Sequence, residues 1–149
     1  MRLTQYTDYS LRVLLYLAHK KDEMVTINEL ADFYKISRNH LVKVVHNLGI
    51  KGYLHTTRGK NGGLRLARPA HEIVIGDVVR KVEPDFELLE CFNRSTDHCV
   101  ITKTCGLKSV LISARDDFLS TLDLYTVADA VKGMNKRSNS FKLIPVIHN

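Results

Sequence analysis

Three cysteines carry the most distinctive chemistry of this 149-residue sequence. Cys91, Cys99 and Cys105 follow the spacing Cys-x7-Cys-x5-Cys within a polar stretch, and the chain contains no fourth cysteine. An odd, clustered set of thiols does not make a disulfide framework and favours a metal or redox site. Structural zinc sites usually have closely paired cysteines and four closed ligands, and this spacing has neither.

Three thiolates with one non-thiolate ligand suit an iron–sulfur cluster with an exchangeable corner. The residues alone leave two alternatives open. His98 is placed to complete a zinc site, although directly beside Cys99 it is also an ordinary loop histidine. Reactive thiols that hold no metal are the second alternative.

The residues ahead of the cysteines show helical periodicity and capping signals. Apolar residues at helical spacing predict a first helix over 4–20. Thr26 and Glu29 form a capping box that opens a second helix over 27–34. Ser37 is then expected to cap a third helix over 37–51. Two helices joined by such a short turn predict a helix-turn-helix.

Residues 53–57 and 64–66 are short strand candidates on either side of a basic, glycine-rich loop. A small hairpin directly after a helix-turn-helix makes a winged helix, so the predicted fold class is mainly α with a small β wing. The predicted division of the chain is a winged helix-turn-helix DNA-binding domain (1–83), an iron–sulfur cluster loop (84–105), a dimerisation helix with a short helix after it (106–131), and a C-terminal tail (132–149).

Apolar residues recur at helical spacing from Leu107 to Leu122, outside the compact winged domain. The short following helix is expected over 126–131. A long helix in this position needs something to cover its apolar stripe, and a second copy of the chain is the simplest cover. We therefore expect a homodimer.

The charge of the chain is unevenly distributed. Residues 1–70 hold 12 Lys and Arg against 5 Asp and Glu, whereas residues 71–149 hold 10 against 11. A basic front half indicates an anionic polymer as its partner, although a merely soluble basic surface explains the charge equally well. No apolar stretch reaches the length of a membrane span and the start lacks a signal-peptide layout, so we expect a cytoplasmic protein with no membrane partner.

The third helix carries polar side chains off its core face, including His46 and Asn47. Arginine pairs with guanine and asparagine with adenine, whereas Ser37, His40 and Lys43 suit phosphate contacts. An ordinary solvated helix face is the alternative. The predicted DNA-binding set, drawn from both helices and the wing, is Asn28, Ser37, Arg38, Asn39, His40, Lys43, Arg58, Gly59, Lys60, Asn61, Gly62 and Gly63.

The loop of the hairpin combines glycines with basic residues, and Arg65 and Arg68 follow it. Glycine lets a backbone approach a phosphate or enter a narrow minor groove, where arginine and lysine exploit the negative potential. The same composition occurs in nucleotide-binding loops, but RGKNGG lacks the P-loop spacing and its following helix. The loop therefore predicts DNA rather than nucleotide binding.

Six segments spread over nearly the whole chain match one known family: LTQYTDYSLRVLLYLA, ISRNHLVKVVHNLGIKGYL, TTRGKNGGLRLARP, IGDVVRKVEP, CVITKTCGLK and FLSTLDLYTVADAV. On these segments the chain resembles the winged-helix iron–sulfur repressors, in particular their nitric-oxide-sensitive (nitrite-sensitive) members. The RGKNGG and IGDVVR segments are specific. One departure is the gap after Cys91, which is longer than in close members; its polar residues fit in a loop at little entropic cost.

The resemblance implies that the three cysteines are cluster ligands and that Asp8 of the partner subunit is the fourth. Arg12, one turn after Asp8, would neutralise the cluster or that aspartate. Asp8 is equally well explained as a first-turn carboxylate favoured by the helix dipole. The implied cofactor is a [4Fe–4S] cluster, with [2Fe–2S] compatible with the same ligands. The implied partners are a palindromic double-stranded operator and nitric oxide as effector, which would derepress nitric-oxide detoxification genes.

Other functions stay open at this point. A cluster-assembly or redox regulator of the same fold is the nearest alternative, and a structural-zinc DNA-binding protein is another. An electron-transfer protein or enzyme is disfavoured because the sequence holds no nucleotide fingerprint and no supported catalytic arrangement. We therefore predict that the chain is not an enzyme.

Overall fold

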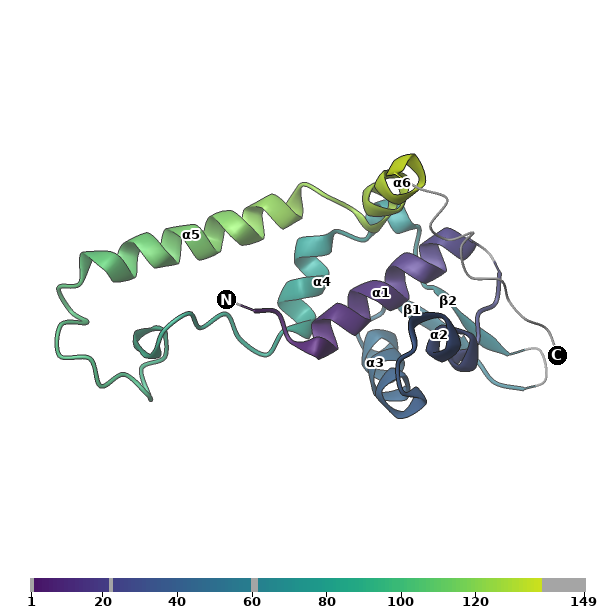
Figure 1. The fold of residues 1–149 in the computed structure, drawn as a ribbon, viewed down its shortest axis with the longest axis horizontal. Coiled ribbons are helices and arrows are strands. Elements are labelled where there is room, and N and C mark those ends of the chain that lie inside the picture. The colour runs from purple at the N-terminus through teal and green to yellow at the C-terminus, as the bar shows by residue number, and fades with distance from the viewer. Residues whose placement is uncertain (1, 22, 60–61, 138–149) are drawn as a thin grey trace.

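The computed structural model describes residues 2–21, 23–59 and 62–137 (Figure 1). It confirms the predicted fold class, because helices dominate and the hairpin is the small sheet. The elements in chain order are α1 (Gln5–Lys20), α2 (Ile27–Tyr34), α3 (Arg38–Ile50), β1 (Leu54–Thr57), β2 (Gly63–Leu66), α4 (Ile75–Val82), α5 (Gly106–Asp123) and α6 (Val127–Arg137), with short 3-10 turns at Ala70–Glu72 and Glu90–Phe92.

Of the two caps predicted from the sequence, the one at Thr26 is present, and the structure adds a cap at Thr4 that was not predicted. The Thr4 hydroxyl accepts the amide of Thr7 at the start of α1, and the Thr26 hydroxyl accepts that of Glu29 at the start of α2. Ser37 occupies the residue before α3, as predicted, but its side chain makes no capping hydrogen bond. The prediction of its position is confirmed and that of its capping bond is wrong.

The core is built around α1. Val13, Leu14 and Leu17 of this helix are fully buried, together with Leu41 and Leu48 of α3. α1 also packs against α4, α6 and β2. Because each buried aliphatic side chain contributes about 1.5–3 kcal/mol, this helix holds the surrounding elements in one arrangement.

The hairpin pairs Leu54 with Leu66 and Thr57 with Gly63, in antiparallel register. A bridge between Val25 and Leu64 adds the segment before α2 to its edge. At Gly62 any side chain would collide with the carbonyl oxygen of Thr57, so the turn requires glycine there. The predicted wing residues Lys60 and Asn61 lie outside the described residues.

The base of the wing is fastened to α4 by a buried tyrosine. Tyr53 donates its hydroxyl hydrogen to Asp77 Oδ2 at 2.9 Å, and Lys81 Nζ lies 2.9 Å from the same oxygen. The hydrogen bond from Lys81 lowers the pKa of Asp77, whereas burial raises that of Tyr53. Arg68 lies 4.9 Å over the Tyr53 ring. Arg68, which follows the basic loop in the sequence, therefore supports the base of the wing.

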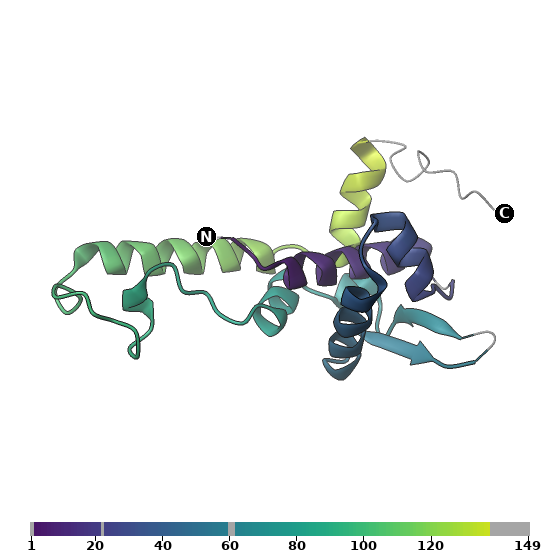
Figure 2. The ribbon, with the colours of Figure 1, turned by 60° about the horizontal axis from the view of Figure 1, so that its bottom comes forward.

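Beyond α4 the chain leaves the winged domain. Residues 84–105 run out beside α5 and return into its start, and α5 extends away from the other helices (Figures 1 and 2). α6 then comes back to pack on α1 and continues to Arg137, beyond the expected end at 131, because VKGMNKR holds several good helix formers. Within the described ranges, no helix has the length and apolarity needed to cross a bilayer.

The Asp77 contacts make a prediction about stability. Asp77→Asn should lower the free energy of unfolding at pH 7 by about 0.5–1 kcal/mol, a small value because the carboxylate is partly exposed. A carboxylate whose pKa is lowered by folding stabilises the protein above its unfolded pKa, and that contribution is lost as the pH falls through the folded value. Denaturant titrations at pH 7 and pH 2 should therefore show the full difference at pH 7 and a smaller one at pH 2, because the contribution declines as the pH falls below the ordinary carboxyl pKa of about 3.9. An equal difference at both values would contradict this origin.

Candidate nucleic-acid interface and cysteine loop

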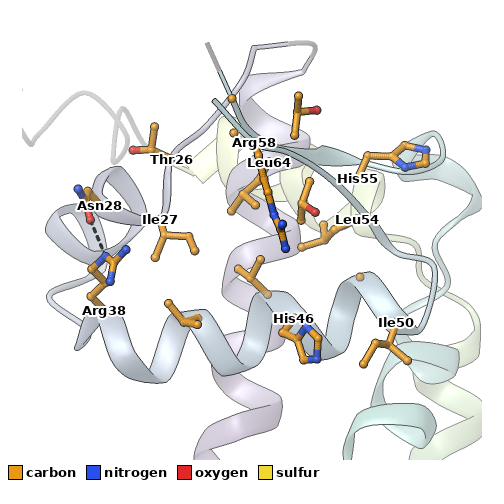
Figure 3. Close-up of a pocket in the computed structure, with 17 residues that line it drawn as sticks. Thr26, Ile27, Asn28, Arg38, His46, Ile50, Leu54, His55, Arg58 and Leu64 are labelled. Carbon is orange, nitrogen blue, oxygen red and sulfur yellow. Dashed lines mark hydrogen bonds between the residues drawn. The ribbon is translucent and has the colours of Figure 1, made fainter. Parts of the chain in front are cut away.

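The exposed side of α3 presents a stripe of side chains toward the wing. Arg38, Val42, His46 and Ile50 are one turn apart along the helix, and all are exposed. They line a groove of about 740 Å³ whose other wall is the hairpin (Figure 3). A helix and a hairpin that flank one groove can enter adjacent grooves of a duplex.

The hairpin sends a basic side chain into this groove. Arg58, at the end of β1, extends from the wing toward α3, and Leu54 and Leu64 lie beneath it (Figure 3). Gly59 follows with φ of 108°, a conformation that favours glycine. Arg58 therefore lies in the groove directly before the hairpin loop, which is predicted to reach the minor groove.

Arg38 is held in place by a residue of the preceding helix. Its Nε donates to Asn28 Oδ1 at 3.1 Å (Figure 3). This bond occupies Nε and leaves both terminal nitrogens of the guanidinium available, and these can pair bidentately with guanine O6 and N7. Asn28 and Arg38, both predicted site residues, are thus brought together, with Asn28 positioned to orient the arginine.

His40 and Lys43 point toward α1 instead of the groove. They line a separate hollow of about 210 Å³ together with Tyr6 and Tyr9. The Tyr6 hydroxyl donates to the carbonyl oxygen of Lys43 at 3.0 Å, and the Tyr9 and His40 rings lie 6.3 Å apart. His40 and Lys43 are therefore separate from the groove that Arg38, Val42, His46 and Ile50 line. This position suits the phosphate contacts predicted for them.

The reading surface differs from the predicted one at three positions of α3. Asn47 does not belong to it, because its Oδ1 is buried and has no hydrogen-bond partner among the described residues. Val42 and Ile50 line the groove, with Ile50 74% exposed, and neither was predicted. Apolar residues are normally assigned to the core, so only their position off the buried face could have revealed them. Asn39 and Ser37 are exposed and line neither hollow.

The first turn of α1 carries the predicted Asp8–Arg12 pair. Arg12 Nε donates to Asp8 Oδ1 at 2.9 Å and its Nη2 lies 2.7 Å from Oδ2. This hydrogen bond raises the pKa of Arg12. Tyr34 donates its hydroxyl hydrogen to the Arg12 carbonyl oxygen, so the pair is held against α2. Asp8 is half-exposed and remains accessible to a further ligand.

Glu83 connects this turn to the start of the cysteine segment. Its carboxylate accepts the backbone amide of Thr4 at 3.1 Å and the hydroxyl groups of Thr4 and Thr7. A carboxylate at a helix N-terminus is favoured by the unpaired amides and the helix dipole. The last residue before the predicted cluster loop is thus anchored to the helix turn that carries Asp8.

The three cysteines are all free thiols but differ in exposure. Cys91 is buried, Cys105 is half-buried and Cys99 is exposed. Among the described residues, no three His, Cys, Asp or Glu side chains are gathered as ligands for one metal ion, and His98 is not brought into such a group. Phe92, beside Cys91, lies under the guanidinium of Arg115, which attaches this part of the loop to α5.

The donor set nevertheless fits a thiolate-bound iron group. Cys105 is the residue before α5, and no side chain caps that helix start. Backbone amides at a helix start have no partner within the helix and can donate to a sulfur atom placed there. Asp97 Oδ1 accepts the Cys99 amide at 3.1 Å and the Thr102 hydroxyl at 2.8 Å, which shapes the turn around Cys99. Soft thiolate ligands of this kind select zinc, copper(I) or iron–sulfur clusters.

Comparison with known proteins identifies a family. Residues 3–133 match the Rrf2 family, described as an iron-dependent transcriptional regulator. The "HTH-type transcriptional regulator NsrR" of Bacillus licheniformis is 52% identical over 132 residues, which cover 88% of this chain and 92% of that protein. The protein of the same name from Bacillus subtilis is 50% identical over 133 residues, which cover 89% and 91%.

A solved structure confirms the fold. The structure titled "T. potens IscR" superposes with a TM-score of 0.73 at 23% identity, and the match covers 93% of this chain and 92% of that one. At this identity the similarity supports the arrangement of the helices and the wing. The predicted resemblance is confirmed by the sequence relatives, which are named as transcriptional regulators and not as enzymes.

The Asn28–Arg38 contact yields a prediction about DNA selectivity. Arg38→Ala should weaken binding to a selected duplex by about 1–3 kcal/mol because a bidentate base contact is lost. Asn28→Ala should cost a smaller part of this energy, because Arg38 stays but loses its orientation. Electrophoretic or fluorescence titrations measure both. Lys132→Ala, which removes a charge on α6, is the control and should bind as the unchanged protein does. Equal losses on selected and random duplexes would contradict base reading by Arg38.

Proposed function

Because the chain belongs to the Rrf2 family of transcriptional regulators, we propose that it is a DNA-binding repressor whose operator affinity is controlled by a nitric-oxide-sensitive iron–sulfur cluster. One observation carries this proposal: all three cysteines lie on the segment that joins the DNA-reading domain to α5. Metal binding to this segment would therefore act on both halves of the molecule at once.

DNA recognition is assigned to two elements. The stripe that includes Arg38 and His46 enters the major groove, and the wing with Arg58 reaches the adjacent minor groove. His40 and Lys43 contact the phosphate backbone from the α1 side. Base contacts supply sequence selectivity, whereas the phosphate contacts supply affinity that falls with salt concentration.

A homodimer formed through α5 completes the regulator. Leu107 and Val110 are 60% and 62% exposed, and Ala114 is exposed on the same stripe. A second copy related by a two-fold axis would cover this stripe. Two winged domains in such a dimer read a palindromic operator whose half-sites lie about 10 base pairs apart or a multiple of that.

The cluster would be held by Cys91, Cys99 and Cys105, with Asp8 of the partner subunit as fourth ligand. When bound, it supplies iron with one weakly held oxygen ligand and thus a corner that nitric oxide can attack. Three thiolates and one carboxylate favour a [4Fe–4S] cluster over [2Fe–2S]. Arg12 forms an ion pair with the Asp8 carboxylate of its own chain. The same ion pair would form again when Asp8 is released from the partner's cluster.

The control of DNA binding follows from the anchor points of the cysteine segment. Glu83 attaches its start to the first turn of α1, and Cys105 leads directly into α5. Holding the three thiolates together would restrain both attachments. Loss of this restraint would loosen the winged domains relative to the α5 pair, and operator affinity would fall.

The central test is anaerobic titration of the protein with its operator. The protein should show a visible iron–sulfur absorption, bind a selected duplex and release it on addition of nitric oxide. Cys99→Ala should lose the absorption and reduce operator affinity by at least about tenfold, which corresponds to roughly 1.4 kcal/mol. Ser95→Ala, in the same segment but without a thiol, is the matched control and should retain both properties.

Two results would reject the proposal. Cluster-free Cys99→Ala protein that binds the operator fully would show that the thiols do not control DNA binding. Release by peroxide but not by nitric oxide would identify a redox or cluster-assembly regulator instead. A colourless anaerobic preparation with one bound zinc per chain would support the structural-zinc alternative.

The dimer can be tested through the α5 stripe. Val110→Glu should raise the dimer dissociation constant by at least about a hundredfold, because burying an unpaired carboxylate among apolar side chains costs several kcal/mol. Ser109→Glu places the same charge on the exposed surface about 100° around the helix from Val110, outside the stripe of Leu107, Val110 and Ala114, and should leave the dimer intact. Light scattering across a concentration series distinguishes the two, and a dimeric Val110→Glu protein would contradict the proposed interface.

A further inference from the structure

The carboxyl end of α5 is joined to α4 by a bidentate ion pair. Arg80 Nη1 donates to Asp123 Oδ1 at 2.5 Å and its Nη2 donates to Oδ2 at 2.7 Å. Both side chains are 41% exposed, so the pair contributes little to the free energy of folding. Two parallel bonds do, however, fix the relative direction of the two planar groups.

A glycine makes room for this ion pair. Gly76, in the first turn of α4, is buried, and a Cβ atom there would collide with Asp123 Oδ1 and lie 3.0 Å from Arg80 Nη1. Glycine in a helix is about 1 kcal/mol less favourable than alanine. In α4 the glycine stands at the position where the Asp123 carboxylate contacts the helix, so no side chain blocks the ion pair.

Backbone hydrogen bonds also join the segment before α4 to the segment between α5 and α6. The Ile75 amide donates to the Tyr125 carbonyl oxygen, and the Val127 amide donates to that of Ile73, both at 2.9 Å. Val74 and Thr126 form an isolated antiparallel bridge between these bonds. The α5 helix is therefore held firmly at its carboxyl end, while it extends away from the winged domain toward its start (Figures 1 and 2).

The length of α5 turns small changes at this junction into large displacements. Its 18 residues span about 27 Å. A rotation of about 10° at the carboxyl end moves the far end by about 5 Å, given that length. Successive base pairs lie about 3.4 Å apart, so such a rotation in a dimer changes which half-site spacing the two α3 helices can reach.

We propose that the Arg80–Asp123 pair, seated over Gly76, sets the angle between the winged domain and α5 and so selects the half-site spacing of the operator. This inference rests on the proposed function, because it requires a DNA-binding dimer formed through α5. Arg80 and Asp123 are positioning residues: neither lines the groove between α3 and the wing. Their substitution should change which operator is chosen without changing how one half-site is read.

The experiment compares spacing profiles of the full-length, anaerobically prepared protein. The probes are a duplex selected by the unchanged protein from a randomised pool, versions of it lengthened or shortened by one base pair at the centre, and a single half-site. Two variants disturb the junction: Arg80→Lys keeps the charge but loses the two-pronged bond, and Gly76→Ala displaces the carboxylate. The charge-swap pair Arg80→Asp with Asp123→Arg restores opposite charges in the reverse direction.

Arg80→Lys and Gly76→Ala should each lower affinity for the original spacing by about tenfold relative to the altered spacings. Binding to the single half-site should stay as in the unchanged protein, and the thermal midpoint should differ by no more than a few degrees, the shift expected for about 1 kcal/mol. Gly133→Ala is the matched control, because Gly133 is also helical and an added Cβ meets nothing within 4 Å. Recovery of the profile by the charge-swap pair would support the role of the ion pair directly.

The outcomes separate the inference from the proposed function. Folded, dimeric Arg80→Lys and Gly76→Ala proteins that keep the original spacing profile would overturn the inference and leave the proposed function standing. Equal losses on every duplex, the single half-site included, would also overturn it, because they would indicate damage to the reading surface. An unchanged protein that is monomeric or selects no duplex would overturn the proposed function together with this inference.

Discussion

The burial of α1 is the constraint on which the other parts of the structure depend. Val13, Leu14 and Leu17 give this helix a continuous buried face, and α3, α4, α6 and the wing all pack around it. Its amino-terminal turn carries Asp8 and donates hydrogen bonds to the Glu83 carboxylate. A single helix thus supports the recognition helix along its length and the proposed cluster ligand at its start. Close packing makes such an element respond as a unit rather than bend locally.

Polar contacts at the edge of this core determine directions more than stability. Tyr53 and Asp77 orient the wing, Asn28 orients Arg38, and Arg80 with Asp123 orients α5. Each contact is at least partly exposed, so its share of the free energy of folding is small. Hydrogen bonds with charged partners are nevertheless strict in geometry. The proposed dimer, which would place two winged domains on one duplex, needs this geometric accuracy.

The cysteine segment is the part of the chain with the least structure of its own. Between α4 and α5 it contains one short 3-10 turn and hydrogen bonds that are mostly local, such as those around Asp97. Its attachments to the rest of the described chain include Glu83 at one end, the Phe92–Arg115 contact, and α5 at the other end. A segment with so few long-range contacts would gain order from a cluster bound by its thiols, which suits the sensor proposed between the winged domain and α5.

Local signals in the sequence were sufficient for the helices, the wing and the clustered thiols. The Thr26–Glu29 capping box marked the start of α2, and the periodicity from Leu107 to Leu122 predicted α5, because both depend on residues within a few turns of each other. The tertiary structure alone decided that the Asn47 side-chain oxygen is buried, that Arg68 lies over Tyr53, and that Val42 and Ile50 line the groove. It also paired Arg80 with Asp123 across Gly76. These outcomes depend on which elements meet in space, and residue spacing along one helix carries no record of the neighbour that the helix will pack against.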